Sequence, residues 1–286
     1  MPTKNRHNFN FFIQDEWKFA KDWQLTGGMR YDNYSDFGDT ANPRVALVWE
    51  TRYALTTKLM YGSAFRAPSF SEMYIINNPV ALGNPKLKPE TLDTTELAFD
   101  YRPLDNLRLG WNVFYYWWKD IINYVPDAGQ PSVTAQNAGS QNGYGTELEA
   151  EWKVFDSLKL LGNYAFQKSL DETLNHDAGN APHHQIYLRT DWEFLPNWHF
   201  VPQSKWIIGR SRVFGDMRPT VDDYTWVDLT LRRKHLAEHW EVAFSVRNLF
   251  DVGAREPSLA GNPTASIPND LPLAGRNFFG EVRFNF

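Results

Sequence analysis

The sequence predicts an all-β fold: part of an antiparallel transmembrane β-barrel with about 12–13 long strands, short periplasmic turns and long extracellular loops. Three observations predict it. Apolar side chains recur at every second position, as in "LRLGWNVFYYW" (107–117). Many such runs exceed the usual globular strand and are long enough for a tilted strand to cross a bilayer. The connections between the runs alternate between short and long.

The alternating runs define the expected strands. They lie at residues 8–20, 22–33, 43–51, 53–65, 92–102, 106–124, 142–155, 157–170, 184–194, 198–213, 223–233, 239–250 and 277–286. Along the last of these, every second side chain from Phe278 to Phe286 is expected to face lipid, and the side chains between them to face the lumen.

The connections argue for a barrel over a soluble β-sandwich or β-helix, which is the alternative fold. The short turns are expected at 20–22, 51–52, 103–106, 155–157, 195–197 and 234–238, and the long loops at about 34–42, 66–91, 125–141, 171–183, 213–222 and 251–276. A soluble sandwich has no physical reason to keep its long loops at one end, whereas an outer-membrane barrel does so regularly.

The composition fits this fold. Aromatic residues make up 16% of the 286 residues, and Trp and Tyr favour the two membrane–water boundaries of a barrel in outer-membrane lipid.

The net charge of -5 gives no footprint for a polyanion, so no nucleic-acid partner is expected. The chain has no cysteine, which excludes disulfides and Cys-based zinc sites. Its first twenty residues lack the apolar core of a signal peptide.

Five short segments carry a family resemblance. In chain order they are "FRAPSFSEMY" (65–74), "NPKLKPE" (84–90), "NAGSQNGYGTELEAEW" (137–152), "RNLFD" (247–251) and "AGRNFFGEVRFNF" (274–286). Each motif alone is weak, but their order resembles the C-terminal barrel portion of TonB-dependent outer-membrane receptors. The resemblance implies that residues 1–286 are the C-terminal part of such a barrel, with no plug domain in this chain. Family barrels have about 22 strands, so about nine strands are expected upstream.

The resemblance also implies a function. It predicts a receptor for TonB-energised uptake of a scarce nutrient, with a ferric siderophore as the favoured metal-chelate ligand and cobalamin or another chelate as the alternative. The TonB complex would act through the plug. The terminal Phe286 resembles the signal that the barrel assembly machinery recognises. No enzyme activity, cofactor or resident metal is expected.

Candidate ligand contacts lie in or beside the long loops: Arg66, Tyr74, Tyr124, Arg210, Arg212 and Arg218. The tyrosines offer flat surfaces, and the last three arginines could attract an anionic ferric complex. The alternative for those three is pairing with local acids, Asp216, Asp222 and Asp223. Likewise, Arg66 could satisfy nearby carbonyls and Pro68 stiffen a turn without contacting a ligand.

Several observations narrow the ligand. No histidine lies between the FRAP-like and NPxL-like segments, where similar haem receptors carry one, so haem is disfavoured. Copper is disfavoured by zero Cys and only 5 Met. The pairs His183–His184 and His235–His239 are not placed to chelate a metal on strands.

Three other functions use a similar barrel. An autotransporter-type translocator needs a helix leading into the lumen, for which residues 1–8 are too short. An outer-membrane phospholipase needs a Ser–His pair on the lipid face, and none is evident. A passive porin needs a constriction loop, and nothing marks one.

Overall fold

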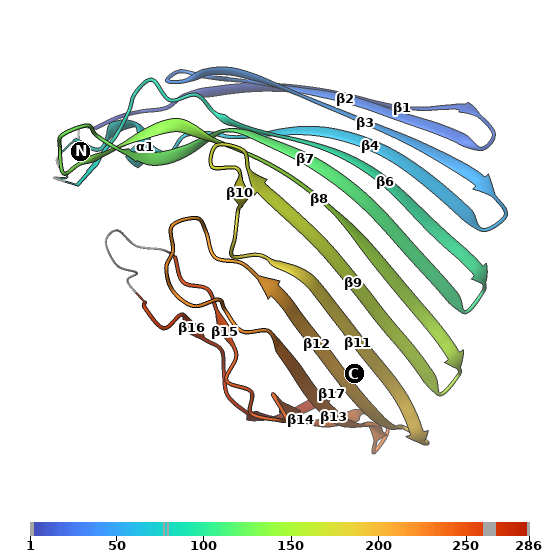
Figure 1. Ribbon diagram of the computed structural model, residues 1–286. Helices are drawn as coiled ribbons and strands as arrows, with labels where there is room; N and C mark the ends of the chain where they lie inside the picture. The colour runs from blue at the N-terminus through green and yellow to red at the C-terminus, as the bar shows by residue number, and fades with distance from the viewer. Residues whose placement is uncertain (1–2, 77, 79, 260–266, 285–286) are drawn as a thin grey trace. The chain divides into compact units, whose positions relative to one another are not determined.

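The computed structural model describes residues 3–76, 78, 80–259 and 267–284 (Figure 1). Among these residues the main element is a 15-stranded sheet in which β1, β2, β3, β4, β6, β7, β8, β9, β11, β12, β13, β14 and β17 follow one another as hydrogen-bonded neighbours. The predicted all-β, antiparallel fold is confirmed. No helix in the described part of the chain is long and apolar enough to cross a membrane.

Each expected strand is present. The long strands are β1 (Asn8–Ala20), β2 (Trp23–Tyr34), β3 (Gly38–Arg52), β4 (Leu55–Arg66), β6 (Glu90–Leu104), β7 (Leu107–Pro126), β8 (Val133–Phe155), β9 (Leu158–Asp171), β11 (Pro182–Leu195), β12 (Trp198–Arg210), β13 (Tyr224–Leu236), β14 (Trp240–Arg247) and β17 (Asn277–Phe284). The minor elements are α1 (Phe70–Tyr74), β5 (Ala81–Leu82), β10 (His176–Asp177), β15 (Arg255–Glu256) and β16 (Leu271–Pro272).

Two connections are shorter than expected. The expected loop at 34–42 is only a turn at 35–37, because β3 already begins at Gly38. The expected loop at 125–141 shrinks to 127–132, because β8 begins at Val133 and runs for 23 residues. The first part of β8, "VTAQNAGSQNG", has no apolar face. A strand segment outside the hydrocarbon needs none, so period-two alternation does not reveal it.

The chain divides into two compact units. Unit 1 comprises Met1–Phe99, Val113–Tyr144 and Ser169–His176, and unit 2 comprises Asp100–Asn112, Gly145–Lys168 and Asp177–Phe286. In unit 1, β1–β4 form a meander with turns at 21–22 and 53–54, and α1 lies at the opposite end of β4 (Figure 1). In unit 2 the turns at 105–106, 156–157, 196–197 and 237–239 are short, whereas 211–223 and 248–276 are long.

The strand register gives each unit an apolar face and a polar face. In unit 1, Ile13, Met29 and Pro43 are successive partners on the apolar face, and Ile13 is 62% exposed. In unit 2, Leu231 and Phe244 are partners on that face and are 41% and 53% exposed. Exposed apolar rows of this extent mark contact with lipid or another partner.

Aromatic pairs lie on the apolar face near the short turns of each unit. In unit 1 the rings of Trp23 and Trp49 stack with centroids 4.8 Å apart. In unit 2 the rings of Trp240 and Phe284 lie 4.9 Å apart. This position matches the predicted aromatic girdle.

The buried apolar cores are small and lie among the loops. In unit 1 the core consists of Met73, Leu87, Ile122 and Ala135. In unit 2 it consists of Ile207, Tyr224 and Ala254, with Trp226 and Val252 packed against it. These clusters hold the loops onto the strand ends, where the candidate ligand contacts lie.

Candidate functional site

The FRAP-like segment folds into a capped turn of helix. Ser69 Oγ accepts a hydrogen bond from Glu72 N at 3.2 Å, and Ser69 N donates to Glu72 Oε2 at 2.7 Å, which completes a capping box around α1. Arg66 also pairs with Glu72, with Nη2 3.1 Å from Oε1. The ion pair and the cap together fix where α1 starts.

A buried carboxylate, Glu90, anchors this segment. Its side chain is only 2% exposed and lies 2.5 Å from Arg66 Nη2. It also accepts hydrogen bonds from Ile122 N at 2.9 Å and Trp118 Nε1 at 3.2 Å. The partners of Arg66 are therefore carboxylates, not the carbonyls that the sequence suggested. Glu90 was not among the sequence candidates because its partners lie far along the chain.

Arg6 ties the segment before β1 to the same loop. Its guanidinium donates to Asp36 at 2.9 Å and to the Pro68 carbonyl at 2.8 Å. It also lies over the rings of Phe37 and Phe70, at 5.1 and 4.8 Å from their centroids. This contact was not predicted either, since residues 3–7 show no pattern.

The two candidate tyrosines differ in surroundings. Tyr74, the last residue of α1, is half-buried, with the Lys4 ammonium 4.9 Å from its ring centroid. Tyr124 lies near the end of β7 and is 43% exposed. Arg66 has 45% of its side chain exposed. All three lie in unit 1, at the end away from the short turns.

The three candidate arginines of unit 2 are engaged by neighbours. Arg210 has a fully buried side chain that donates to the carbonyls of Arg255 and Asp222, both at 2.6 Å. Arg212 pairs with Asp270 at 2.6 Å, and Arg218 pairs with Asp216 at 2.6 Å. The alternative, in which these arginines pair with nearby acids, thus holds for Asp216. Asp222 instead accepts through its backbone carbonyl, and the Asp223 carboxylate accepts a hydrogen bond from Gly209 N.

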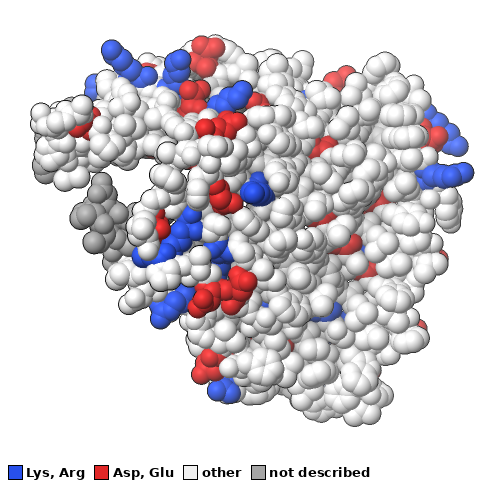
Figure 2. Space-filling view, in the orientation of Figure 1, with Lys and Arg blue, Asp and Glu red and all other residues white. Residues whose placement is uncertain are grey.

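These ion pairs join the loops at 211–223 and 248–276. Hydrogen bonds from the Arg218 guanidinium lower the pKa of Asp216 to about 2, although partial burial opposes the shift. Those from Arg212 hold the pKa of Asp270 well below its usual range. Both carboxylates are therefore ionised at neutral pH. Figure 2 shows blue and red atoms intermixed over the loops of unit 2.

The "NLFD" motif shapes the start of the second loop. Asn248 is fully buried and bridges Val252, with Nδ2 donating to its carbonyl at 2.9 Å and Oδ1 accepting from its N–H at 2.8 Å. Asp251 accepts from Arg276 N at 2.7 Å. Asp251 thus joins the start of the loop at 248–276 to its end.

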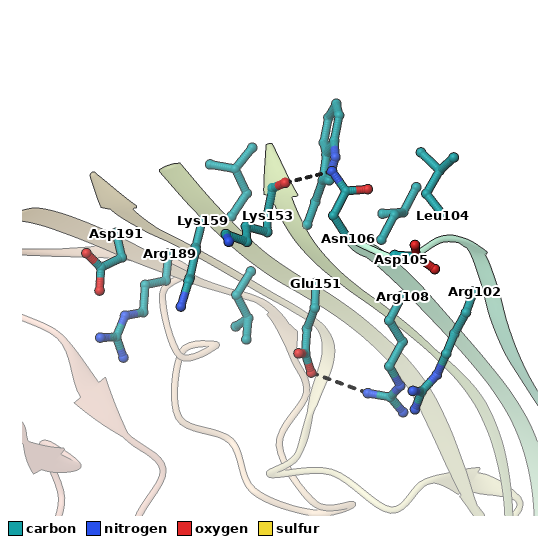
Figure 3. A pocket seen from close by; sticks show the side chains of 14 residues that line it. Arg102, Leu104, Asp105, Asn106, Arg108, Glu151, Lys153, Lys159, Arg189 and Asp191 are labelled. Carbon is teal, nitrogen blue, oxygen red and sulfur yellow. Dashed lines mark hydrogen bonds and ion pairs between the residues drawn. The ribbon is translucent and has the colours of Figure 1, made fainter. Parts of the chain in front are cut away.

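A charged pocket of about 1100 Å³ lies at the short-turn end of unit 2 (Figure 3). Arg108 points towards Glu151, and its Nη1 lies 3.3 Å from Glu151 Oε1 and 3.0 Å from Glu149 Oε2. Arg108 of β7 thus pairs with two glutamates of the neighbouring strand β8. Lys159 and Arg189 also line this pocket and make no ion pair within the described residues.

The remaining predictions concern the histidine pairs, as metal ligands, and Phe286 at the end of the chain. His183 Nε2 lies 2.7 Å from Asp177 Oδ2, and His184 Nδ1 lies 2.8 Å from the Tyr164 hydroxyl. The described residues contain no group of three or more His, Cys, Asp or Glu side chains placed to hold a metal ion. Phe286, the predicted assembly signal, lies outside the described residues.

Comparisons with known proteins agree with the antiparallel sheet of long strands described above. A family model described as TonB dependent receptor-like, beta-barrel, matches residues 1–249. The iron-regulated outer membrane virulence protein of Vibrio cholerae is 28% identical over 64% of the chain, and the vitamin B12 transporter BtuB of the same species is 27% identical over 96%. The chain spans 31% and 41% of the length of these two relatives.

The fold has a solved counterpart. A mutant of the ferric enterobactin receptor PfeA from Pseudomonas aeruginosa superposes with a TM-score of 0.84 and 20% identity, covering 98% of this chain and 45% of that one. The family consists of transport receptors and not enzymes, and its members lie in the outer membrane, as predicted. With the family match over most of its length, the chain belongs to the β-barrel family of TonB-dependent receptors.

Proposed function

We propose that the chain is part of an outer-membrane receptor that takes up a ferric siderophore with energy supplied through TonB. In this proposal, a plug domain and further strands encoded upstream complete the receptor, and the TonB complex acts on the plug. One relative is named as iron-regulated, which supports iron as the cargo.

The ordering of the long loops by ion pairs is the observation that carries this proposal. Arg66, Glu72 and Glu90 fix α1 in unit 1, and Arg212 and Asp270 join two loops in unit 2. Loops fixed before the ligand arrives lose less conformational entropy on binding. Such loops suit a receptor that captures a dilute ligand.

The exposed candidates are proposed as direct contacts. Arg66 pairs with Glu72 and Glu90 but keeps 45% of its side chain exposed, so that a ligand can reach its guanidinium. Tyr74 and Tyr124 offer flat surfaces in unit 1. Arg210, Arg212 and Arg218 are proposed to act on the ligand mainly by holding the loops, since neighbours occupy their guanidinium groups. Their attraction of an anionic complex stays a prediction.

Cobalamin is the second candidate. It is favoured by one observation: the match to the vitamin B12 transporter covers 96% of the chain, against 64% for the iron-regulated relative. The absence of a histidine from residues 69–83 of the sequence disfavours haem.

Uptake by cells decides between the two cargoes. A strain lacking the gene is given the full-length receptor and supplied with radio-iron-labelled siderophores of several classes or with labelled cobalamin. We expect uptake of at least one ferric siderophore that requires both the receptor and TonB. Uptake of cobalamin alone would replace the siderophore proposal, and receptor-dependent uptake in cells without TonB would contradict the energy source.

A further inference from the structure

A carboxylate interrupts the apolar face of unit 1 on its edge strand, β1. Every second residue of β1 lies on that face: Phe9, Phe11, Ile13, Asp15, Trp17 and Phe19. Asp15 is the one charged residue of these six, and it is exposed. The apolar face meets hydrocarbon in an outer-membrane barrel, where an ionisable side chain is costly. A carboxylate at this position therefore indicates a specific partner.

The side chains around Asp15 offer it no such partner. Its cross-strand partner on β2 is Gly27, where an added Cβ would meet nothing within 4 Å, so the surface beside the carboxylate is open. Ile13 and Trp17, which flank it along β1, are exposed and apolar. Within the described part of the chain, the Asp15 carboxylate accepts a hydrogen bond only from Glu16 N, at 3.0 Å.

That hydrogen bond lies at the open edge of β1. Ser35 N donates to His7 O at 3.0 Å, and the register continues from there, so the odd-numbered residues up to Trp17 exchange backbone hydrogen bonds with β2. The N–H of Glu16 therefore points to the other side, where no described strand pairs with β1. Asp15 Oδ1 takes the place that the carbonyl of a further strand would fill. A strand that pairs there would accept from Glu16 N and release the carboxylate.

A second carboxylate on the same face shows how such a group is satisfied in this sheet. Tyr61 of β4 lies in the same cross-strand row as Asp15, through Gly27 and Val45. Its hydroxyl donates to Asp93 Oδ1 of β6 at 3.0 Å. A neighbouring strand thus supplies a donor side chain to the Asp93 carboxylate, and a hydrogen bond of this kind offsets much of the cost of placing a polar group in hydrocarbon.

We infer that the strand next to β1 in the complete receptor presents a hydroxyl side chain opposite Asp15, as Tyr61 does to Asp93. A hydroxyl donor costs less in hydrocarbon than a lysine or an arginine. The strand belongs to the same polypeptide, since this chain spans 31% and 41% of the length of two relatives. The inference rests on the proposed function for the existence of that strand, and it adds the chemistry of the pairing at Asp15.

The heat stability of the full-length receptor tests the inference, measured as the temperature at which the folded band disappears on electrophoresis. Asp15→Leu should lower this temperature by about 2–4 °C, because the donor on the next strand loses its acceptor. Asp15→Asn should keep most of the stability, since its amide oxygen still accepts. Tyr61→Phe is the matched reference, because it removes one hydroxyl donor from Asp93. An Asp15→Leu receptor as stable as wild type, or more stable, would mean that the carboxylate faces lipid without a donor and would overturn the inference.

Photo-cross-linking identifies the neighbour of β1. A benzoylphenylalanine in place of Phe11, on the same face, should attach to an upstream peptide of the same polypeptide, which mass spectrometry then locates. Removing the hydroxyl found opposite Asp15 should add nothing to the effect of Asp15→Leu. An adduct between two receptor copies, or a neighbour without a hydroxyl at that position, would overturn the inference. Siderophore uptake is scored separately in the same cells, so a folded receptor that transports no siderophore would contradict the proposed function and leave the pairing at Asp15 standing.

Discussion

At the scale of single residues, buried carboxylates at the bases of the loops hold these loops in place, as disulfides do in many external proteins. The chain has no cysteine, and its loops are held instead by carboxylates enclosed among donors. Glu90 is 2% exposed and has Arg66, Ile122 N and Trp118 as donors. Removing one member of such a set leaves the others without partners, which costs more than the intact set contributes.

Replacing Glu90 with alanine tests this role. The Ile122 amide and the Trp118 indole lose their acceptor, and the local free energy of opening should fall by about 2 kcal/mol. Amide hydrogen exchange at Ile122 should then accelerate about 30-fold. Glu147→Ala serves as the control, since Glu147 is an exposed glutamate on β8. Equal exchange in wild type and Glu90→Ala would show that the carboxylate does not hold the loop.

The pKa of Asp216 predicts how the unit 2 loops respond to acid. The folded-state pKa of about 2 lies below the ordinary value, so the ion pair with Arg218 contributes fully above that ordinary value. The contribution is lost as the pH falls through about 2. Pepsin cleavage within 211–223 should therefore stay slow at about pH 3.5. At that pH an aspartate with the ordinary pKa near 3.9 would be more than half protonated and would have lost most of its ion pair.

The variant Arg218→Ala shifts this response. Without the guanidinium, the pKa of Asp216 returns towards its ordinary value, so cleavage of the loop should begin at a higher pH. Arg233→Ala is a suitable control, because Arg233 lies on β13 near the short turns and donates to the Pro196 carbonyl at 2.5 Å. A cleavage profile that does not move in Arg218→Ala would refute the role of this pair.

At the scale of elements, alternation predicted every long strand, because a strand with lipid on one face must repeat with period two. It could not predict the first part of β8, whose sequence "VTAQNAGSQNG" has no apolar face. Nor could it predict α1, since five residues are too few for helical periodicity, although Ser69 and Glu72 have capping-box spacing. For the candidate site, the sequence predicted which loops carry the candidate residues. It could not predict the anchoring role of Glu90, because that role depends on the Ile122 amide of a different strand.

Within this sheet, Gly143 of β8 is a position where an aromatic ring covers the backbone. A Cβ built there would lie 2.5 Å from Tyr116 Cε1, too close for any contact. The Tyr116 hydroxyl also lies 2.6 Å from Ser169 Oγ and accepts from Gln141 Nε2 at 2.6 Å. The ring is thus held by polar contacts at its far end and cannot swing away without breaking them.

Gly143→Ala should therefore destabilise unit 1. Overpacking of this kind costs about 1–3 kcal/mol. In the full-length receptor, the temperature at which the folded band disappears on electrophoresis should fall. Gly280→Ala on β17 is the matched control, since a Cβ there meets nothing within 4 Å. Equal temperatures for the two variants would argue that the Tyr116 ring moves freely.

At the scale of the whole molecule, the two edge strands of the sheet matter most. Within the described residues, β1 pairs with β2 alone and β17 pairs with β14 alone. Every residue of β1 is exposed, and its apolar row includes Phe11 and Trp17. Backbone groups left unpaired in hydrocarbon each cost several kcal/mol. Both edges therefore need strand partners in a membrane.

We predict that the 286-residue chain, expressed alone and refolded into detergent, does not form a stable monomeric barrel. Its edge strands, β1 and β17, would pair with other copies, because long apolar edges template such pairing. The sample should elute as aggregates, and its electrophoretic mobility should not change on heating. The full-length receptor, in which the proposed upstream strands cover both edges, should run as a heat-modifiable monomer in the same detergent. A monomeric, heat-modifiable form of the 286-residue chain would contradict the prediction, because it would mean that β1 and β17 are satisfied without strands from outside this chain.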